Sequence, residues 1–68
     1  MDLLYRGAQI TVTERKHFWD ADIWMIRERD LLWGFVTQAK HVGVDAEAML
    51  ARCHKIVDEK IAFERGRY

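Results

Sequence analysis

The last third of the chain carries the clearest pattern of apolar and polar positions. From Ala46 onward, apolar residues recur at steps of three and four, which is the spacing of one face of an α-helix. Asp45 stands directly before this pattern and can cap the helix by accepting a backbone N–H of its first turn. The pattern therefore predicts a helix from Ala46 to about Arg65. Its apolar stripe consists of Ala46, Met49, Leu50, Cys53, Ile56, Val57 and Ile61.

The first two thirds of the chain favour strands. Residues 8–13 alternate between apolar and polar or hydroxyl side chains, which predicts one strand. Residues 18–39 are rich in Trp, Ile, Phe and Val, and Arg29-Asp30 divides them into two runs of strand length. We expect strands at about 19–28 and 31–39, joined by a tight turn at Arg29-Asp30. The turn lacks the Asn-Gly or Asp-Gly of a typical two-residue hairpin, so a longer loop stays open.

A helix is the alternative for this middle segment, because Trp19, Ile23 and Ile26 also have helical spacing. A helix there would leave the first strand without a pairing partner, so strands are favoured. The predicted fold class is α+β. We expect a three-stranded antiparallel sheet followed by one C-terminal helix that packs on one face.

Length and composition limit what the chain can be. With 68 residues it has room for one domain, spanning 1–68. Lysine and arginine balance aspartate and glutamate, so the formal net charge is zero. A chain with zero net charge lacks the excess of positive charge that is usual in nucleic-acid-binding proteins. Two copies of such a chain also do not repel each other through their net charge. One cysteine excludes an intrachain disulfide, and no run resembles a signal peptide or a membrane span, so a cytoplasmic location is expected.

The predicted sheet carries more apolar side chains than one helix can cover. With a turn at Arg29-Asp30, Trp24 pairs with Phe35, and the two side chains share one face of the sheet. A single helix can cover only one of the two faces. An uncovered face of this size usually marks an interface, and tryptophan is enriched at binding hot spots. Another strand register would instead place these aromatic residues in the core beneath the helix, and both readings stay open. The predicted interface, for another protein or a second copy of the chain, consists of Trp24, Ile26, Leu31, Trp33 and Phe35.

Basic residues beside aromatic residues suggest a second binding function. Arg15-Lys16-His17 directly precedes Phe18-Trp19, and such a mixture can grip phosphates and stack on bases. A solvated loop explains the same residues more simply, because the net charge is zero. The candidate nucleic-acid contacts are Arg15, Lys16, Arg27, Arg29 and Lys40.

Catalytic and metal-binding signatures are weak. Asp20 and Asp22 lie on one side of a strand, but no further oxygen ligand stands at a compatible spacing. Cys53 and His54 are sequential, so on a helix they point about 100° apart, and no Cys-x-x-Cys occurs. We expect no catalytic residue, no metal site and no cofactor.

Several short motifs carry a resemblance. These are Tyr5-Arg6-Gly7, the spacing to Ile10 and Val12, Trp19-x-Ala21-x-Ile23, and Ile56-Val57-Asp58-Glu59. Together they resemble small, mostly uncharacterised bacterial proteins of strand-strand-strand-helix layout, which implies the same fold. HicB-like antitoxins and plant ethylene-response DNA-binding domains share this order of elements, and the latter also open with Tyr-Arg-Gly. This chain lacks the arginine- and tryptophan-dense strands of such DNA readers.

The sequence therefore predicts a non-enzymatic protein-interaction module that self-associates, most simply as a homodimer. The alternative is a nucleic-acid-binding or antitoxin-like regulator.

Overall fold

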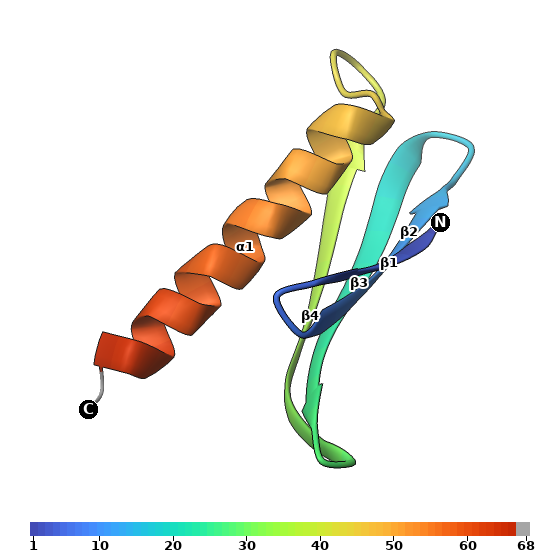
Figure 1. Cartoon of the computed structure of the whole chain (residues 1–68). Helices are drawn as coiled ribbons and strands as arrows, with labels where there is room; N and C mark the ends of the chain where they lie inside the picture. The colour runs from blue at the N-terminus through green and yellow to red at the C-terminus, as the bar shows by residue number, and fades with distance from the viewer. Residues whose placement is uncertain (67–68) are drawn as a thin grey trace.

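The computed structural model describes residues 1–66, with side chains up to residue 64. It contains the strands β1 (Asp2–Tyr5), β2 (Ala8–Glu14), β3 (Phe18–Arg27) and β4 (Asp30–Lys40), followed by the helix α1 (Ala46–Gly66). The strands form one antiparallel sheet in the order β1-β2-β3-β4, and α1 crosses one of its faces (Figure 1). The predicted α+β class and the predicted helix on one face are confirmed.

The helix begins where the pattern predicted. The carboxylate of Asp45 accepts a hydrogen bond from the backbone N–H of Ala48 at 2.8 Å, as an N-cap should. The apolar stripe faces the sheet, and Met49, Cys53 and Val57 are fully buried there. With Ile10 and Ile23 from the two central strands they form the centre of the core, which lies between α1 and the middle of the sheet.

The prediction of three strands is wrong, because β1 adds a fourth. β1 has only four residues, too few to show a period of two, and its Leu3-Leu4 pair hides the alternation. Arg6 and Gly7 join β1 to β2, and both have positive φ angles, +51° and +86°. This is the conformation of a two-residue hairpin turn, which Gly7 adopts without steric cost.

The turn between β3 and β4 lies one residue earlier than predicted. Ile26 pairs with Leu31 and Arg27 with Asp30, so the turn residues are Glu28 and Arg29. Both have positive φ angles, +51° and +74°, although neither is glycine or asparagine. The usual marker residues of such a turn are absent, which is why sequence reasoning misplaced it.

The strand register differs from the prediction as a result. Trp24 lies opposite Gly34 rather than Phe35, and a bulge between Met25 and Ile26 gives β4 one extra residue, Leu32. Because side chains alternate across a strand, a slip of one residue moves those of β4 to the other face. Trp33 and Phe35 therefore lie on the helix side of the sheet.

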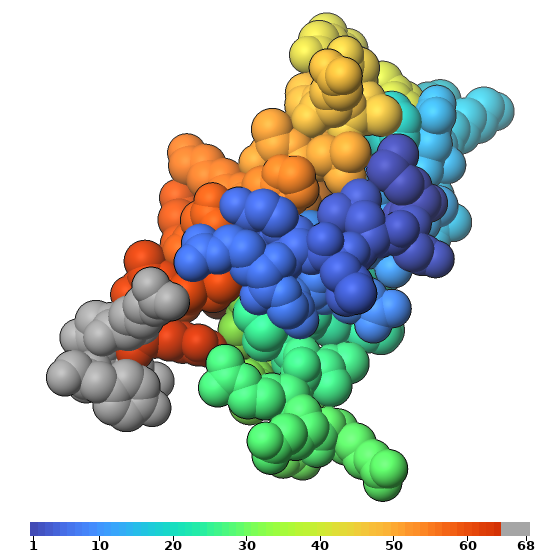
Figure 2. All heavy atoms as spheres, in the orientation of Figure 1, coloured from blue at the N-terminus to red at the C-terminus, as the bar shows by residue number. Residues whose placement is uncertain are grey.

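The β3–β4 hairpin extends past the rest of the molecule. The last β3 residue that pairs with β2 is Met25, so the hairpin tip has no third strand beside it. Figure 2 shows the tip projecting beyond the ends of β1 and β2, away from the start of α1. In the part of the chain that the structure describes, no helix has both the length and the apolar character to cross a membrane.

The position of the turn can be tested with glycine. Glu28→Gly should raise the free energy of unfolding by about 0.5–1 kcal/mol, because glycine adopts a positive φ without the clash that Glu28 incurs. Asp30→Gly is the matched control and should lower it by a similar amount, because Asp30 is a strand residue. Urea denaturation measures both. The reverse order of stabilities would place the turn at Arg29-Asp30.

Candidate functional site: the apolar surface of the β3–β4 hairpin

Six large apolar side chains are exposed on the outer part of the β3–β4 hairpin, and we call them the hairpin surface. Their exposed fractions run from 39% for Phe35 to 64% for Leu31. Large apolar side chains are usually exposed singly, so six on one hairpin make it the candidate contact surface. The hairpin surface consists of Trp24, Ile26, Leu31, Leu32, Phe35 and Val36.

Trp24 is the largest side chain on the open face of the sheet, which α1 does not cover. It lies across from Gly34, and a Cβ atom on Gly34 would come within 3.3 Å of Cδ1 of the indole. The glycine thus leaves room for the indole to lie close against β4. Ile26 and Leu31 pair directly beside it, and Val36 stands on the same face opposite Asp22.

Trp33 and Phe35 lie on the helix side. The ammonium group of Lys60 is 5.9 Å from the ring centre of Trp33 and 5.3 Å from that of Phe35, distances at which a cation is attracted to an aromatic face. The indole N–H of Trp33 is buried and has no acceptor among the described residues. A shallow groove of about 320 Å³ runs between β4 and the second half of α1, lined by Phe35, Ile56, Glu59, Lys60 and Phe63.

The structure divides the predicted interface between the two faces. Trp24, Ile26 and Leu31 lie on the open face, whereas Trp33 and Phe35 lie on the helix side, where Trp33 packs against the core. The alternative reading, with aromatic residues beneath the helix, thus applies to part of the set. The predicted interface left out Leu32 and Val36, and the correct turn position would have placed Val36 on the open face beside Trp24. The role of these residues as an interface stays a prediction.

β4 is also an edge of the sheet. It has eleven residues, against four for the opposite edge strand β1, and no strand lies beyond it among residues 1–66. Long edge strands carry unpaired backbone groups, and proteins usually protect them with charges, proline or bulges. β4 has only the bulge at Leu32 and one charge near each end, Asp30 and Lys40. Its edge is therefore open to pairing with another strand.

The basic residues do not form one patch. Arg15, Lys16 and Lys40 lie at one end of the sheet, and Arg27 and Arg29 lie at the hairpin tip. β3 has ten residues at about 3.3 Å each, so the two groups are about 30 Å apart.

One of the two basic groups borders a hollow. The hollow measures about 460 Å³ and is lined by His17, Phe18, Gln38, Ala39 and Lys40. Arg15, close by, already lies 3.7 Å from the carboxylate of Asp20. Its positive charge is therefore partly balanced within the chain.

The groups weighed for catalysis or metal binding have other roles. Asp20 lies near Arg15 and accepts a long hydrogen bond from the side chain of Gln38 at 3.5 Å. Cys53 is fully buried, and burial raises the pKa of its thiol, which disfavours the reactive thiolate. No cluster of three metal-ligating side chains occurs among the described residues.

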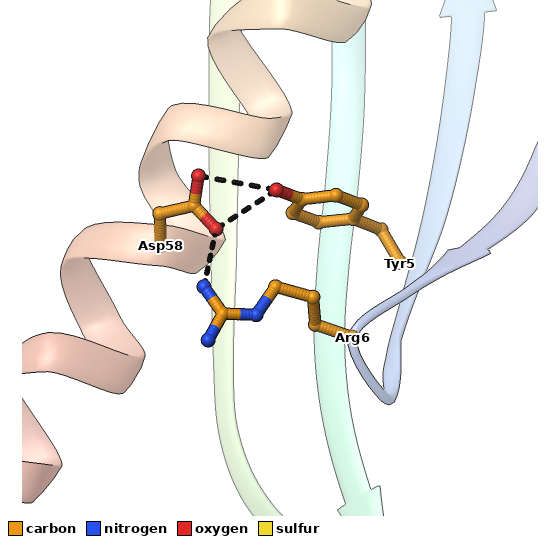
Figure 3. A network of polar contacts seen from close by, with 3 residues as sticks. All are labelled: Tyr5, Arg6 and Asp58. Carbon is orange, nitrogen blue, oxygen red and sulfur yellow. Dashed lines mark hydrogen bonds and ion pairs between the residues drawn. The ribbon is translucent and has the colours of Figure 1, made fainter.

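A polar network ties the β1–β2 turn to α1 (Figure 3). The hydroxyl of Tyr5 donates a hydrogen bond to the carboxylate of Asp58, at 2.9 and 3.1 Å from its two oxygens. The guanidinium of Arg6 lies 2.7 Å from the same carboxylate. The ring of Tyr5 also stacks on His54, with ring centres 4.0 Å apart.

The electrostatics of this network suit a structural contact. The hydrogen bonds from Arg6 and then Tyr5 hold the pKa of Asp58 below its ordinary value, and the bond to Asp58 raises the pKa of Tyr5. Tyr5 therefore stays protonated and Asp58 charged, which maintains the link between the first hairpin and the helix. Two of the motifs that carry the resemblance, Tyr5-Arg6-Gly7 and Ile56-Val57-Asp58-Glu59, contribute the residues of this network. Their contact joins the first hairpin to the helix, which is a structural role.

Comparison with protein-family models, curated proteins and solved structures found no match. The resemblance to small bacterial strand-strand-strand-helix proteins therefore stays a prediction. What can be said of function comes from the hairpin surface and the edge of β4.

The network makes a testable prediction about pH. NMR titration of the Asp58 carboxyl carbon should give a pKa below the ordinary aspartate value, and Arg6→Gln should raise it more than Tyr5→Phe, because Arg6 contributes most. Since the folded pKa is lowered, the stabilisation is complete above the unfolded-state pKa and is lost as pH falls through the folded one. Arg52→Gln is the control, since it removes a positive charge from α1 at a position outside the network. It should leave the pKa of Asp58 unchanged. Equal effects of the two arginine variants would contradict this assignment.

Proposed function

We propose that the protein is a non-enzymatic interaction module that self-associates as a homodimer through the hairpin surface and β4. This proposal depends on two features that occur together on β4, an open edge and exposed apolar side chains. β4 is an eleven-residue edge strand with exposed apolar side chains on both faces. Each feature alone is common, but together they provide backbone hydrogen bonding and apolar burial at one place.

The energetics support a dimer of moderate strength. Completing the burial of a half-exposed large apolar side chain stabilises by about 1 kcal/mol. The side chains that a contact along β4 can cover are those of the strand itself, Leu31, Leu32, Phe35 and Val36. Association itself costs about 4–15 kcal/mol in lost freedom of motion. Backbone pairing along the edge adds to the apolar contribution. The zero net charge adds no repulsion between copies.

The rival function, a nucleic-acid-binding or antitoxin-like regulator, has less support. The basic residues that would contact phosphate are divided between the two ends of the sheet. Binding to nucleic acid would show a strong dependence on salt, since contacts to phosphate release counterions. A titration with single- and double-stranded oligonucleotides at low salt therefore distinguishes the two functions.

A lysine on β4 tests the proposed dimer. Wild-type protein should sediment at high micromolar concentration with a mass near twice 8.1 kDa. Val36→Lys should raise the Kd at least tenfold, because it places a charge in the middle of the contact. Analytical ultracentrifugation over a concentration series measures both.

Val42→Lys is the matched control. Val42 is 90% exposed in the segment between β4 and α1, so the same substitution there should leave the Kd unchanged. A wild-type protein that stays monomeric at high micromolar concentration would overturn the proposal. Equal weakening by the two lysines would show that the contact lies elsewhere.

A further inference from the structure

We infer that the two copies join β4 to β4 in antiparallel orientation, about a twofold axis perpendicular to the sheet. This inference rests on the proposed self-association and specifies its geometry. It makes one continuous eight-stranded sheet, with both helices on the same face. Such a contact is self-complementary, because each copy offers the same strand.

Packing of the two open faces against each other is disfavoured. Outside the hairpin surface the open face carries a large apolar side chain, Leu4, which is 76% exposed. The face also carries the polar residues Asp2, Thr11 and Asp22, in one row that ends at Val36. Asp20 lies in the next row beside Thr13. A face-to-face dimer would bury these carboxylates, and a buried charge without a partner is strongly destabilising. Joining the edges leaves them in water.

The other edge of the sheet is poorly suited to the contact. β1 offers only four residues. β4 offers Trp33–Lys40 as an uninterrupted stretch after the bulge at Leu32. Eight residues exceed the length of a typical strand.

The charges on β4 select the orientation. The strand carries a carboxylate near its start, Asp30, and an ammonium group at its end, Lys40. Antiparallel pairing brings Asp30 of each copy toward Lys40 of the other. Parallel pairing would bring like charges together at both ends, and parallel ladders are slightly less stable per residue.

Antiparallel joining also completes the apolar cover. With both helices on one face, the two grooves between α1 and β4 lie on either side of the joined strands. Trp33 and Phe35 of each copy, which α1 covers only in part, then have the partner's aromatic residues as neighbours. On the opposite face, the Val36 side chains come together near the axis.

Charge reversal tests this orientation in the full chain. Asp30→Lys and Lys40→Asp should each raise the Kd about three- to tenfold at low salt, because each creates like-charge contacts at both ends of the joint. The double variant, and an equimolar mixture of the two single variants, should return to within about twofold of wild type. Asp2→Lys and Lys55→Asp are controls with the same changes of charge away from β4, and neither should change the Kd by more than about twofold.

Distances between spin labels provide an independent readout. Labels on the Leu31→Cys and Gln38→Cys variants, in separate samples, should give at least one distance above about 20 Å in an antiparallel dimer, since the two positions are seven residues apart. Two short distances would overturn the antiparallel orientation without contradicting the dimer. The same conclusion would follow if neither the double variant nor the mixture of single variants restored the wild-type Kd. A wild-type protein without any dimer would overturn the proposed function itself.

Discussion

One amphipathic helix cannot cover a four-stranded sheet. α1 lies over the central strands, where Ile10 and Ile23 meet Met49, Cys53 and Val57 in a fully buried core. The exposed apolar surface of the molecule follows from that limit. On the helix side of β4, Trp33 and Phe35 are only partly covered, and on the open face Val36 is exposed, so apolar surface remains at one edge of the sheet.

The two edges of the sheet are treated differently. The β1 edge is short and is tied to the helix by Tyr5, Arg6 and Asp58. The β4 edge is long and carries Leu31 and Val36 close to its open backbone, with Trp24 of the neighbouring strand β3 on the same face. A monomer gains nothing from such an edge, because exposed apolar side chains beside unpaired backbone groups invite association. This asymmetry is the reason for proposing that the protein self-associates through β4.

Local patterns predicted most of the fold. The helix has a capping residue and a long apolar stripe, and both depend only on residues close in sequence. The strand at residues 8–13 alternates cleanly, so it was also predicted correctly. β1 was missed because four residues are too few to show a period. The turn at Glu28 and Arg29 was missed because neither residue is one that usually adopts a positive φ.

The candidate site depended on that turn. From sequence alone, one can conclude that the chain has more apolar sheet residues than a single helix can cover, since this follows from counting side chains against the width of one stripe. Which of them remain exposed was decided only in the tertiary structure. Moving the turn by one residue puts Trp33 and Phe35 beneath Lys60 and leaves Val36 beside Trp24. Strand register depends on pairing between distant segments, and no local pattern records it.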